Sequence, residues 1–473
     1  MPQIAKACRR PIPSALPRKF YRPRDHEASP FFKIVRDCFD EFEQVYPERF
    51  QQRYGYWRPV IRSSIDKFLK CGDLKEGFAR VRCKDCGEEF FVAFSCRQRS
   101  CCPSCDQKRA LLLGLRLQEE VLADVPHLQW VFTIPKRLRV YFRYDRSLLG
   151  KLCRAAYETV VAVYKLELDG DCGVPAMVGA VQTFGDLIHW HSHIHAIVAE
   201  GVFTETGHFV YIPDIWRHKA ADIWREKVFD LLLDEFRIDL DTAANMRQWK
   251  HSGFNVDQSV RIEAGDWEGM QRLVEYISRC PFSIARMVTL NTEGRIVYRA
   301  SKGKCFPFPH TGDPVLPERE IAPVQTLMDG IPRNFEVFDP LDFLAEVTQH
   351  IPNKGEHQIR YYGWYSNKKR GMQEKKVAAP GLPEPDSAFR RKCRMTWAAL
   401  IKCVYEVDPL RCPRCGGEMK IISFIEEDAV IEKILRHCGL WKEQAPRPPP
   451  EEQLPLTAAE PTLDYGFFQK TCA

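Results

Sequence analysis

The chain has 473 residues, of which 45% are hydrophobic, and this length is sufficient for about two or three domains with apolar cores. The net charge of +6 is only mildly basic, so nucleic-acid binding must be inferred from local clusters rather than from overall composition. The sequence shows no signal peptide and no apolar run of about 18 residues, which excludes a membrane-spanning protein and argues against a disulfide framework for its 19 cysteines.

Residues 1–29 contain several prolines, arginines and lysines and are predicted to form a flexible basic arm. Residues 30–110 combine helical stretches with a cysteine-rich segment. Two Cys-x2-Cys knuckles separated by 15 residues occur there, at Cys83, Cys86, Cys102 and Cys105. Because this spacing is typical of a tetrahedral zinc ribbon, we predict that the four thiolates bind one structural Zn²⁺ ion.

Three further cysteines in the segment from Cys71 to Cys105 have no assigned role. Any of Cys71, Cys96 and Cys101 is able to replace an assigned ligand or to join a second site. Basic residues surround the knuckles, namely Arg80, Arg82, Lys84, Arg97, Arg99, Lys108 and Arg109. We therefore interpret residues 30–110 as a zinc-binding domain that contacts the DNA backbone.

Strands and helices alternate over the next part of the chain, residues 111–305. The predicted elements are a helix at 106–123, a strand at 128–134, a helix at 146–166, a strand at 174–184, a helix at 215–236 and a strand at 254–263. Strands joined by tight turns and interleaved with helices predict an α+β fold, in which helices cover an antiparallel sheet.

A further strand carries a histidine at every second position, from His189 through His191 and His193 to His195. Alternate side chains of a strand share one face, so the four imidazoles should form a row opposite an apolar face. Neighbours in such a row lie about 6.5–7 Å apart, which lets two of them, but not four, converge on one cation. The pair His193 and His195 is the strongest candidate because it lies deepest in the apolar run.

The segment from Asp266 to Arg279 is predicted to be a helix that Asp266 caps and that Cys280 and Pro281 end. Tyr276 lies beside its apolar stripe, on a face that also carries Arg272 and Arg279. A phenol flanked by two cations suits an anionic substrate, whereas a core or rim position is the alternative for this tyrosine.

The remaining sequence has two motifs. Residues 306–355 are interpreted as a connector, and residues 356–440 as a mostly helical region. Near the start of that region, aromatic residues precede a basic run, namely Tyr361, Tyr362, Trp364 and Tyr365 before Lys368, Lys369 and Arg370. Such a motif suits unpaired bases stacked along a charged groove, or equally an aromatic core.

The second motif in that region is a further knuckle at Cys412 and Cys415. Its partners stay open among Cys393, Cys403, His437 and Cys438, and a turn without metal is the alternative. Residues 441–473 read as a disordered tail.

Four of these motifs follow the order found in the rolling-circle transposases of the insertion sequence 91 family. They are the cysteine-rich segment 71–105, Gln182–Gly185 leading into His191–His195, Tyr276–Pro281, and Arg360–Ser366 followed by Lys369–Gly371. The chain resembles this family from about residue 30 to about residue 440.

The resemblance implies a DNA strand transferase of the HUH class, named for two histidines that flank a bulky hydrophobic residue. His193 and His195 would hold Mg²⁺ or Mn²⁺, and Tyr276 would attack a phosphate of single-stranded DNA at the element's ends or target. The product would be a 5′ phosphotyrosine, with Arg272, Arg279 and the Lys368–Arg370 run as DNA contacts. The implied setting is the bacterial cytoplasm, in association with the nucleoid.

The sequence also departs from some relatives. Cys280 occupies the position of their second tyrosine, so the chain looks like a single-tyrosine form, and a homo-oligomer or a free hydroxyl would supply the second attack. The third metal ligand is left between Gln182 and His191. A zinc-dependent DNA-binding protein without catalysis and an HUH replication initiator remain the alternative functions.

Overall fold

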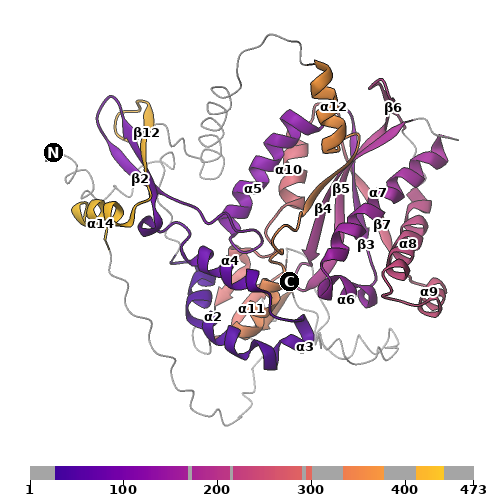
Figure 1. Cartoon of the computed structure of the whole chain (residues 1–473), viewed down its shortest axis with the longest axis horizontal. Coiled ribbons are helices and arrows are strands. Elements are labelled where there is room, and N and C mark those ends of the chain that lie inside the picture. The colour runs from indigo at the N-terminus through magenta and orange to yellow at the C-terminus, as the bar shows by residue number, and fades with distance from the viewer. Residues whose placement is uncertain are drawn as a thin grey trace, which may run out of the picture.

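The computed structural model describes residues 27–168, 173–212, 217–289, 294–300, 334–377 and 412–441. This part of the chain forms three antiparallel sheets with helices packed around them, so the predicted α+β class is confirmed (Figure 1). None of the helices in these ranges has the length and apolarity needed to cross a lipid bilayer.

The predicted elements of residues 111–305 are present with boundaries shifted by only a few residues. The helices are α2 (Pro30–Arg49), α3 (Gln51–Tyr54), α4 (Pro59–Leu69), η1 (Leu74–Glu76), α5 (Pro103–Arg116), η2 (Leu117–Val121), α6 (Lys136–Tyr144), α7 (Ser147–Glu167), α8 (Arg217–Asp234), α9 (Leu240–Arg247), α10 (Trp267–Ile277), η3 (Ile284–Arg286), α11 (Pro340–Gln349), α12 (Asn367–Val377) and α14 (Asp428–His437). The strands are β1 (Phe78–Cys83), β2 (Glu89–Ala93), β3 (His127–Thr133), β4 (Val174–Phe184), β5 (Trp190–Phe203), β6 (Phe209–Tyr211), β7 (Asn255–Ile262), β8 (Met287–Thr289), β9 (Ile296–Arg299), β10 (Phe335–Phe338), β11 (Ile359–Gly363) and β12 (Met419–Ile425).

The largest sheet has the strand order β11-β4-β5-β3-β7, with β6 paired to β5, and the histidine strand β5 lies at its centre. Helices cover both faces (Figure 1). On one face Ile194, Ala196 and Val198 join a core built with α6, α7 and α8. On the other face Ile197 and Ala199 pack with the apolar stripe of α10. Burial on both sides explains why β4 and β5 are almost continuously apolar around the histidines.

A second unit packs against the first. Its helices α2, α4 and α11 and its sheet β10-β9-β8 share one aromatic-rich core, in which Phe31 contacts Phe282 and Phe343. Arg58, just before α4, is linked to the end of α11, because its guanidinium donates to the carbonyls of Thr348 and Ile351 at 2.9 and 2.7 Å. The segment predicted as a connector therefore contributes a buried helix, α11, to the packing of the N-terminal helices.

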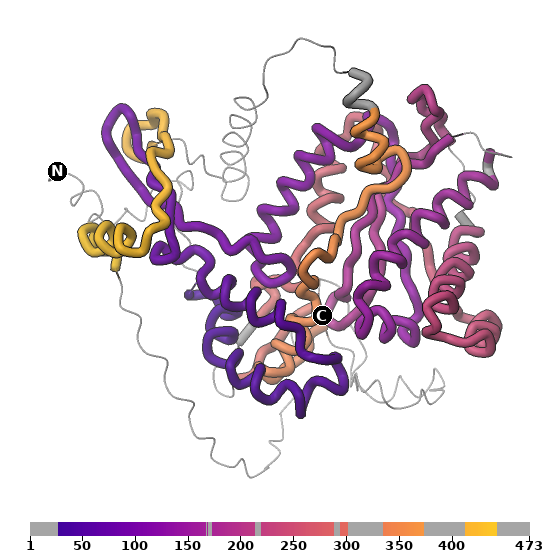
Figure 2. The backbone as a smooth tube through the Cα atoms, in the orientation of Figure 1, coloured from indigo at the N-terminus to yellow at the C-terminus, as the bar shows by residue number. Residues whose placement is uncertain are grey.

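The third sheet has the order β12-β1-β2 and brings together segments from opposite ends of the chain. In Figure 2 the yellow C-terminal segment lies beside the purple hairpin of β1 and β2. The pairing is antiparallel and extends from Phe78 opposite Ile425 to Cys83 opposite Met419. This contact was not predicted from the sequence.

Strand β11 adds the aromatic motif to the edge of the largest sheet, paired with β4. Tyr362 stacks on Tyr157 with ring centroids 5.1 Å apart, and Trp364 stacks on Phe203 at 4.9 Å. Tyr365 is 1% exposed, and its hydroxyl lies 2.8 Å from His127 Nε2. Of the two interpretations left open for this motif, these contacts favour a role in core packing over base stacking.

Candidate active site and cysteine clusters

The predicted histidine pair converges on one point in the middle of β5. The Nε2 atoms of His193 and His195 lie 3.1 Å apart, and the two residues are only 8% and 3% exposed. Their neighbours across the ladder are Gln182 on β4, opposite His193, and Val131 on β3, opposite His195. Two nitrogens at this separation are both within reach of a single cation bound at about 2.1 Å.

Hydrogen bonds to the other ring nitrogens orient both imidazoles. His193 donates from Nδ1 to the carbonyl of His191 at 2.8 Å, which leaves the lone pair on Nε2. Nδ1 of His195 lies 2.9 Å from the side-chain amide of Gln129 on β3, which was not predicted as part of the site. Because an amide presents either its nitrogen or its oxygen, this contact accommodates both tautomers of His195.

The surroundings keep the pair uncharged. Burial, with a further contribution from nearby arginines, lowers the pKa of His193 to about 4. Burial and the charges of His193 and Arg279 lower the pKa of His195 to about 2. Both rings are therefore neutral at pH 7, and neutral imidazole is the form that binds a metal ion.

The other two histidines of the predicted row differ from this pair. The ring of His191 lies 4.7 Å from that of His193, and its Nε2 is buried without a hydrogen-bond partner. His189 is not in the row, because it lies before the first residue of β5, Trp190. Ile188, the residue before His189, has a φ of 73°, so the backbone is not extended there. The prediction of four aligned imidazoles is thus wrong for His189.

His189 instead lies 2.6 Å from Glu336 and 3.4 Å from Glu346. Burial lowers its pKa, but hydrogen bonds to these two carboxylates outweigh that effect and raise the pKa to about 10. A charged imidazolium held between two carboxylates is a structural link between the start of the strand and the second unit, rather than a metal ligand.

Tyr276 faces the histidine pair from the neighbouring helix. Asp266 caps α10 as predicted, by accepting a hydrogen bond from the Gly269 amide at 2.8 Å. The apolar stripe of the helix is buried against the sheet, whereas the Tyr276 side chain is 46% exposed. Its ring lies 5.5 Å from the ring of His195, edge to face at 87°. The phenol is thus beside the imidazoles and open to solvent.

Gln182 connects the tyrosine helix to the histidine strand. Its side-chain nitrogen donates to the carbonyls of Ile277 and Tyr276, at 2.8 and 3.3 Å, where α10 ends. Its side-chain oxygen is buried without a hydrogen-bond partner. Such an orphaned acceptor next to two neutral imidazoles fits a divalent ion with mixed nitrogen and oxygen ligands. Within the described residues, no His, Cys, Asp or Glu completes a group of three with the pair.

Two of the predicted arginines have different environments. The guanidinium of Arg279 lies 4.6 Å from the centre of the Tyr276 ring and 5.6 Å from that of Phe184. A pocket of about 560 Å³ opens beside it, between the start of α5 and the loop after α10. Arg272 has a side chain that is 70% exposed, and it lies 3.8 Å from Glu268. Arg279 is therefore the arginine that borders the tyrosine.

A third arginine, Arg139 on α6, was missed. Its Nε donates to the carbonyl of Ile134 at 3.1 Å, and burial lowers its pKa to about 10. Its charge also lowers the pKa of His191 and His193. Among the residues that the structure describes, no acidic side chain forms an ion pair with it. The run Lys136–Arg143 carries four cations in one short helix, and this was the signal available in the sequence.

The predicted basic run on α12 supports the local fold. Arg370 donates to the carbonyl of Tyr365 at 3.2 Å, and its guanidinium lies 5.2 Å from the centre of the Tyr361 ring. Lys368 is exposed, and Lys369 is half-buried. Arg370 thus anchors the edge strand, and the two lysines are the members of the run that remain candidates for DNA contact.

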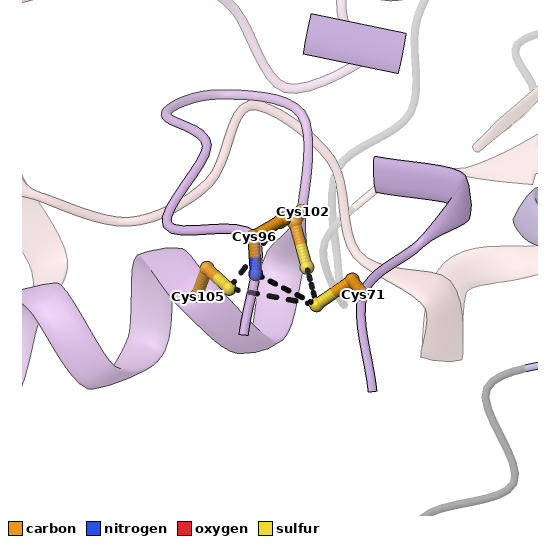
Figure 3. A group of neighbouring side chains, drawn as sticks. All are labelled: Cys71, Cys96, Cys102 and Cys105. Carbon is orange, nitrogen blue, oxygen red and sulfur yellow. Dashed lines mark hydrogen bonds between the residues drawn. The ribbon is translucent and has the colours of Figure 1, made fainter. Parts of the chain in front are cut away.

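Four cysteines of the N-terminal region form a compact cluster at the start of α5 (Figure 3). Its members are Cys71, Cys96, Cys102 and Cys105. The Sγ atom of Cys71 lies 3.8 Å from those of Cys102 and Cys105, and Cys96 Sγ lies 3.5 Å from Cys105 Sγ. Four thiolates around zinc at about 2.3 Å would be separated by about 3.8 Å, so this donor set fits a closed structural zinc site.

The predicted grouping of the four knuckle cysteines is wrong. Cys102 and Cys105 belong to the cluster above, whereas Cys83 and Cys86 lie in a separate cluster with Cys412 and Cys415. The reason is that the hairpin of β1 and β2 carries the first knuckle away from α5. Cys101 is in neither group, and burial raises the pKa of its thiol.

Residues 41–134 match a family model described as a transposase zinc-binding domain, and residues 176–372 match one described as a putative transposase. The chain is 26% identical over 393 residues to the transposase of insertion sequence element IS801 from Pseudomonas savastanoi pv. phaseolicola, covering 77% of this chain and 84% of that relative. It is 24% identical over 316 residues to the putative transposase y4qJ of Sinorhizobium fredii, covering 63% and 71%.

No solved structure matches the chain significantly. The matched regions and their order define the protein as a zinc-binding transposase. More narrowly, the chain belongs to the insertion sequence 91 family of transposases.

Proposed function

We propose that this transposase nicks and rejoins single-stranded DNA at the ends of its element through a 5′ phosphotyrosine intermediate on Tyr276. The observation that carries the proposal is the meeting of three side chains from two elements. The ring of Tyr276 lies 5.5 Å from that of His195, and the Nε2 atoms of His195 and His193 lie 3.1 Å apart. A nucleophile beside a pair of neutral imidazoles is the arrangement that metal-assisted phosphoryl transfer requires.

In the proposed reaction the phenolic oxygen of Tyr276 forms a bond to phosphorus. The bond from phosphorus to the 3′ oxygen breaks, the phenol loses its proton to solvent, and the leaving oxygen gains one to become a 3′ hydroxyl. A bound Mg²⁺ or Mn²⁺ would supply charge stabilisation at the phosphate. His193 and His195 would hold this ion, with the side-chain oxygen of Gln182 as the third protein ligand. Gln182 also fixes the end of α10, and therefore the position of Tyr276.

The energy of the broken bond is kept in the tyrosyl ester, so rejoining to a second 3′ hydroxyl needs no nucleotide cofactor. Cys280, one turn after Tyr276, does not supply a second nucleophile, because burial raises the pKa of its thiol well above the usual value. The second attack would therefore come from a DNA 3′ hydroxyl or from Tyr276 of another copy of the chain.

The proposal is tested by incubating the protein with single-stranded oligonucleotides that carry the element's ends. With Mg²⁺ or Mn²⁺ we expect a covalent adduct on a denaturing gel, and with EDTA we expect none. Digestion followed by mass spectrometry should identify a 5′ phosphate ester on Tyr276. An intact oligonucleotide under all conditions, despite binding, would instead favour the alternative of a DNA-binding protein without catalysis.

Arg139 is predicted to contact the DNA phosphate next to the scissile one. In the part of the chain that the structure describes, no acidic side chain pairs with this half-buried guanidinium, so a phosphate that reaches it adds a favourable interaction. The variant Arg139→Gln should weaken single-strand binding by about tenfold or more, and lower the slope of log K against log salt by about 0.7. Fluorescence anisotropy over a salt series measures both values. Arg137→Gln, on the exposed side of the same helix, is the matched control, and an equal loss in both variants would contradict a specific role for Arg139.

A further inference from the structure

Two cysteine pairs from distant parts of the sequence meet at the end of the third sheet. Cys83 Sγ lies 3.5 Å from Cys415 Sγ, and Cys86 Sγ lies 3.4 Å from Cys412 Sγ, with all four atoms within 4.8 Å of one another. We propose that these cysteines bind a second structural zinc ion, which fastens the C-terminal segment 412–441 to the hairpin of β1 and β2.

The half of the cluster at Cys412 and Cys415 is shaped as a metal-binding knuckle. The amides of Arg414 and Gly417 each donate to a cysteine sulfur, to Cys412 and Cys415 respectively, at 3.4 Å. The turn between the two cysteines is closed by the Gly416 amide, which donates to the Cys412 carbonyl at 2.9 Å. Amide donation to sulfur stabilises thiolates, so the backbone prepares these two residues as ligands.

Glycines allow the second knuckle to approach the first. Gly416 adopts a φ of 73°, which favours glycine. A Cβ on Gly417 would meet the Asp85 carboxylate at 2.0 Å, and Asp85 lies between the two cysteines of the first knuckle. The two turns are thus able to pack closely because residue 417 is a glycine and has no Cβ.

Apolar packing alone gives this module little stability. Within the described residues, the buried side chains around the cluster are those of Val81, Cys83, Cys412 and Met419, and those beneath α14 are Phe78, Phe91, Ile431, Leu435 and Cys438. On β12, Ile422 and Phe424 are 47% and 64% exposed. Small modules with so few buried residues usually require a metal ion or disulfides for a stable fold.

Two disulfides are the chemical alternative to zinc at this position. The sulfur separations of 3.4 and 3.5 Å are far longer than a disulfide bond of about 2.05 Å and close to the edges of a zinc–thiolate tetrahedron. Cys83 and Cys86 lie within the matched range 41–134, whereas Cys412 and Cys415 lie outside both matched ranges, 41–134 and 176–372. The ion would therefore join a matched region to an unmatched one.

Exposure distinguishes this site from the cluster at α5. Cys415 is exposed, whereas each member of the α5 cluster is buried or half-buried. Before it removes the ion of the α5 cluster, a chelator should therefore remove the ion bound by the cluster with Cys415. Release of that ion would free β12 and α14 while the histidine strand and the tyrosine helix keep their packing.

The test is the metal content of the full-length protein, measured by inductively coupled plasma mass spectrometry. We expect two zinc ions per chain in the wild type and one in the double variant Cys412→Ser, Cys415→Ser. The control Cys438→Ala changes a buried cysteine of the same module that is not a ligand, and it should retain two. One ion in the wild type, two in the double variant, or loss of free thiols to two disulfides would each overturn the proposal.

Hydrogen exchange on the same samples keeps the result independent of global folding. Exchange should become at least tenfold faster in β12 and α14 of the double variant and remain unchanged in β5 and α10. If the double variant binds one zinc ion and its β12 amides stay protected, the second ion does not attach segment 412–441 to the hairpin. That result would overturn the structural role proposed for the ion. The outcome does not depend on the tyrosine chemistry, because neither measurement uses DNA cleavage.

Discussion

The Tyr276→Phe variant is expected to form no covalent adduct with single-stranded DNA, a loss of at least about 10³-fold in nicking, because phenylalanine lacks the attacking oxygen. The ring would keep its edge contact with His195 and its place under Arg279, so folding and DNA affinity should be almost unchanged. Denaturing gels measure the adduct, and anisotropy measures the affinity.

Tyr56→Phe is the matched control, since Tyr56 is 81% exposed and distant in sequence from the site. His193→Ala should also bind DNA but form the adduct far more slowly, because one ligand of the ion is lost. An adduct that persists in Tyr276→Phe would show that another residue is the nucleophile, and the proposed role of Tyr276 would then be rejected.

The Cys102→Ser variant is expected to lose about 4–5 kcal/mol of stability together with the zinc ion of the α5 cluster. Cys102 is 1% exposed, forms part of the core shared by α2, α4 and α11, and precedes the first residue of α5. Chemical denaturation followed by tryptophan fluorescence measures the stability, and a chromogenic chelator measures the released zinc.

This loss should extend to catalysis. Helix α5 packs against α10, where the Gln271 side chain occupies the space beside Gly114. Disorder in α5 would therefore displace Tyr276. Cys38→Ser, which changes a half-buried cysteine outside both clusters, should retain the zinc and most of the stability. Full stability of Cys102→Ser in the presence of EDTA would rule out a structural role for this ion.

The parts of the site that the sequence predicts are those determined by local patterns. The two-residue period places His193 and His195 on one face of a strand, and Asp266 with its apolar stripe defines a helix that presents Tyr276 beside that stripe. Both patterns depend on neighbours within a few residues. Their meeting across the sheet came instead from the family resemblance, because a strand and a helix separated by many residues have no local signal for contact.

The errors have the opposite origin. The two knuckles in residues 30–110 have the spacing of one zinc ribbon. Spacing alone does not show that the first knuckle lies at the turn of the β1–β2 hairpin, away from α5. Cys412 and Cys415, which join Cys83 and Cys86, lie more than 300 residues further along the chain and just before β12, the strand that pairs with β1. His189 fits the histidine period, but the positive φ of Ile188 ends the strand pattern just before Trp190. Arg139 lies in a basic run, but the sequence does not distinguish it from the neighbouring cations, whereas its environment does.

The position of β11 also affects the order in which the largest sheet is completed during synthesis. Ile359 pairs with Ala180, and the Tyr365 hydroxyl contacts His127, so the histidine sheet acquires this edge only after β11 has been synthesised. Until then, β4 has an unpaired edge. The sheet that holds His193 and His195 is therefore complete only after segments that are far apart in the chain have paired.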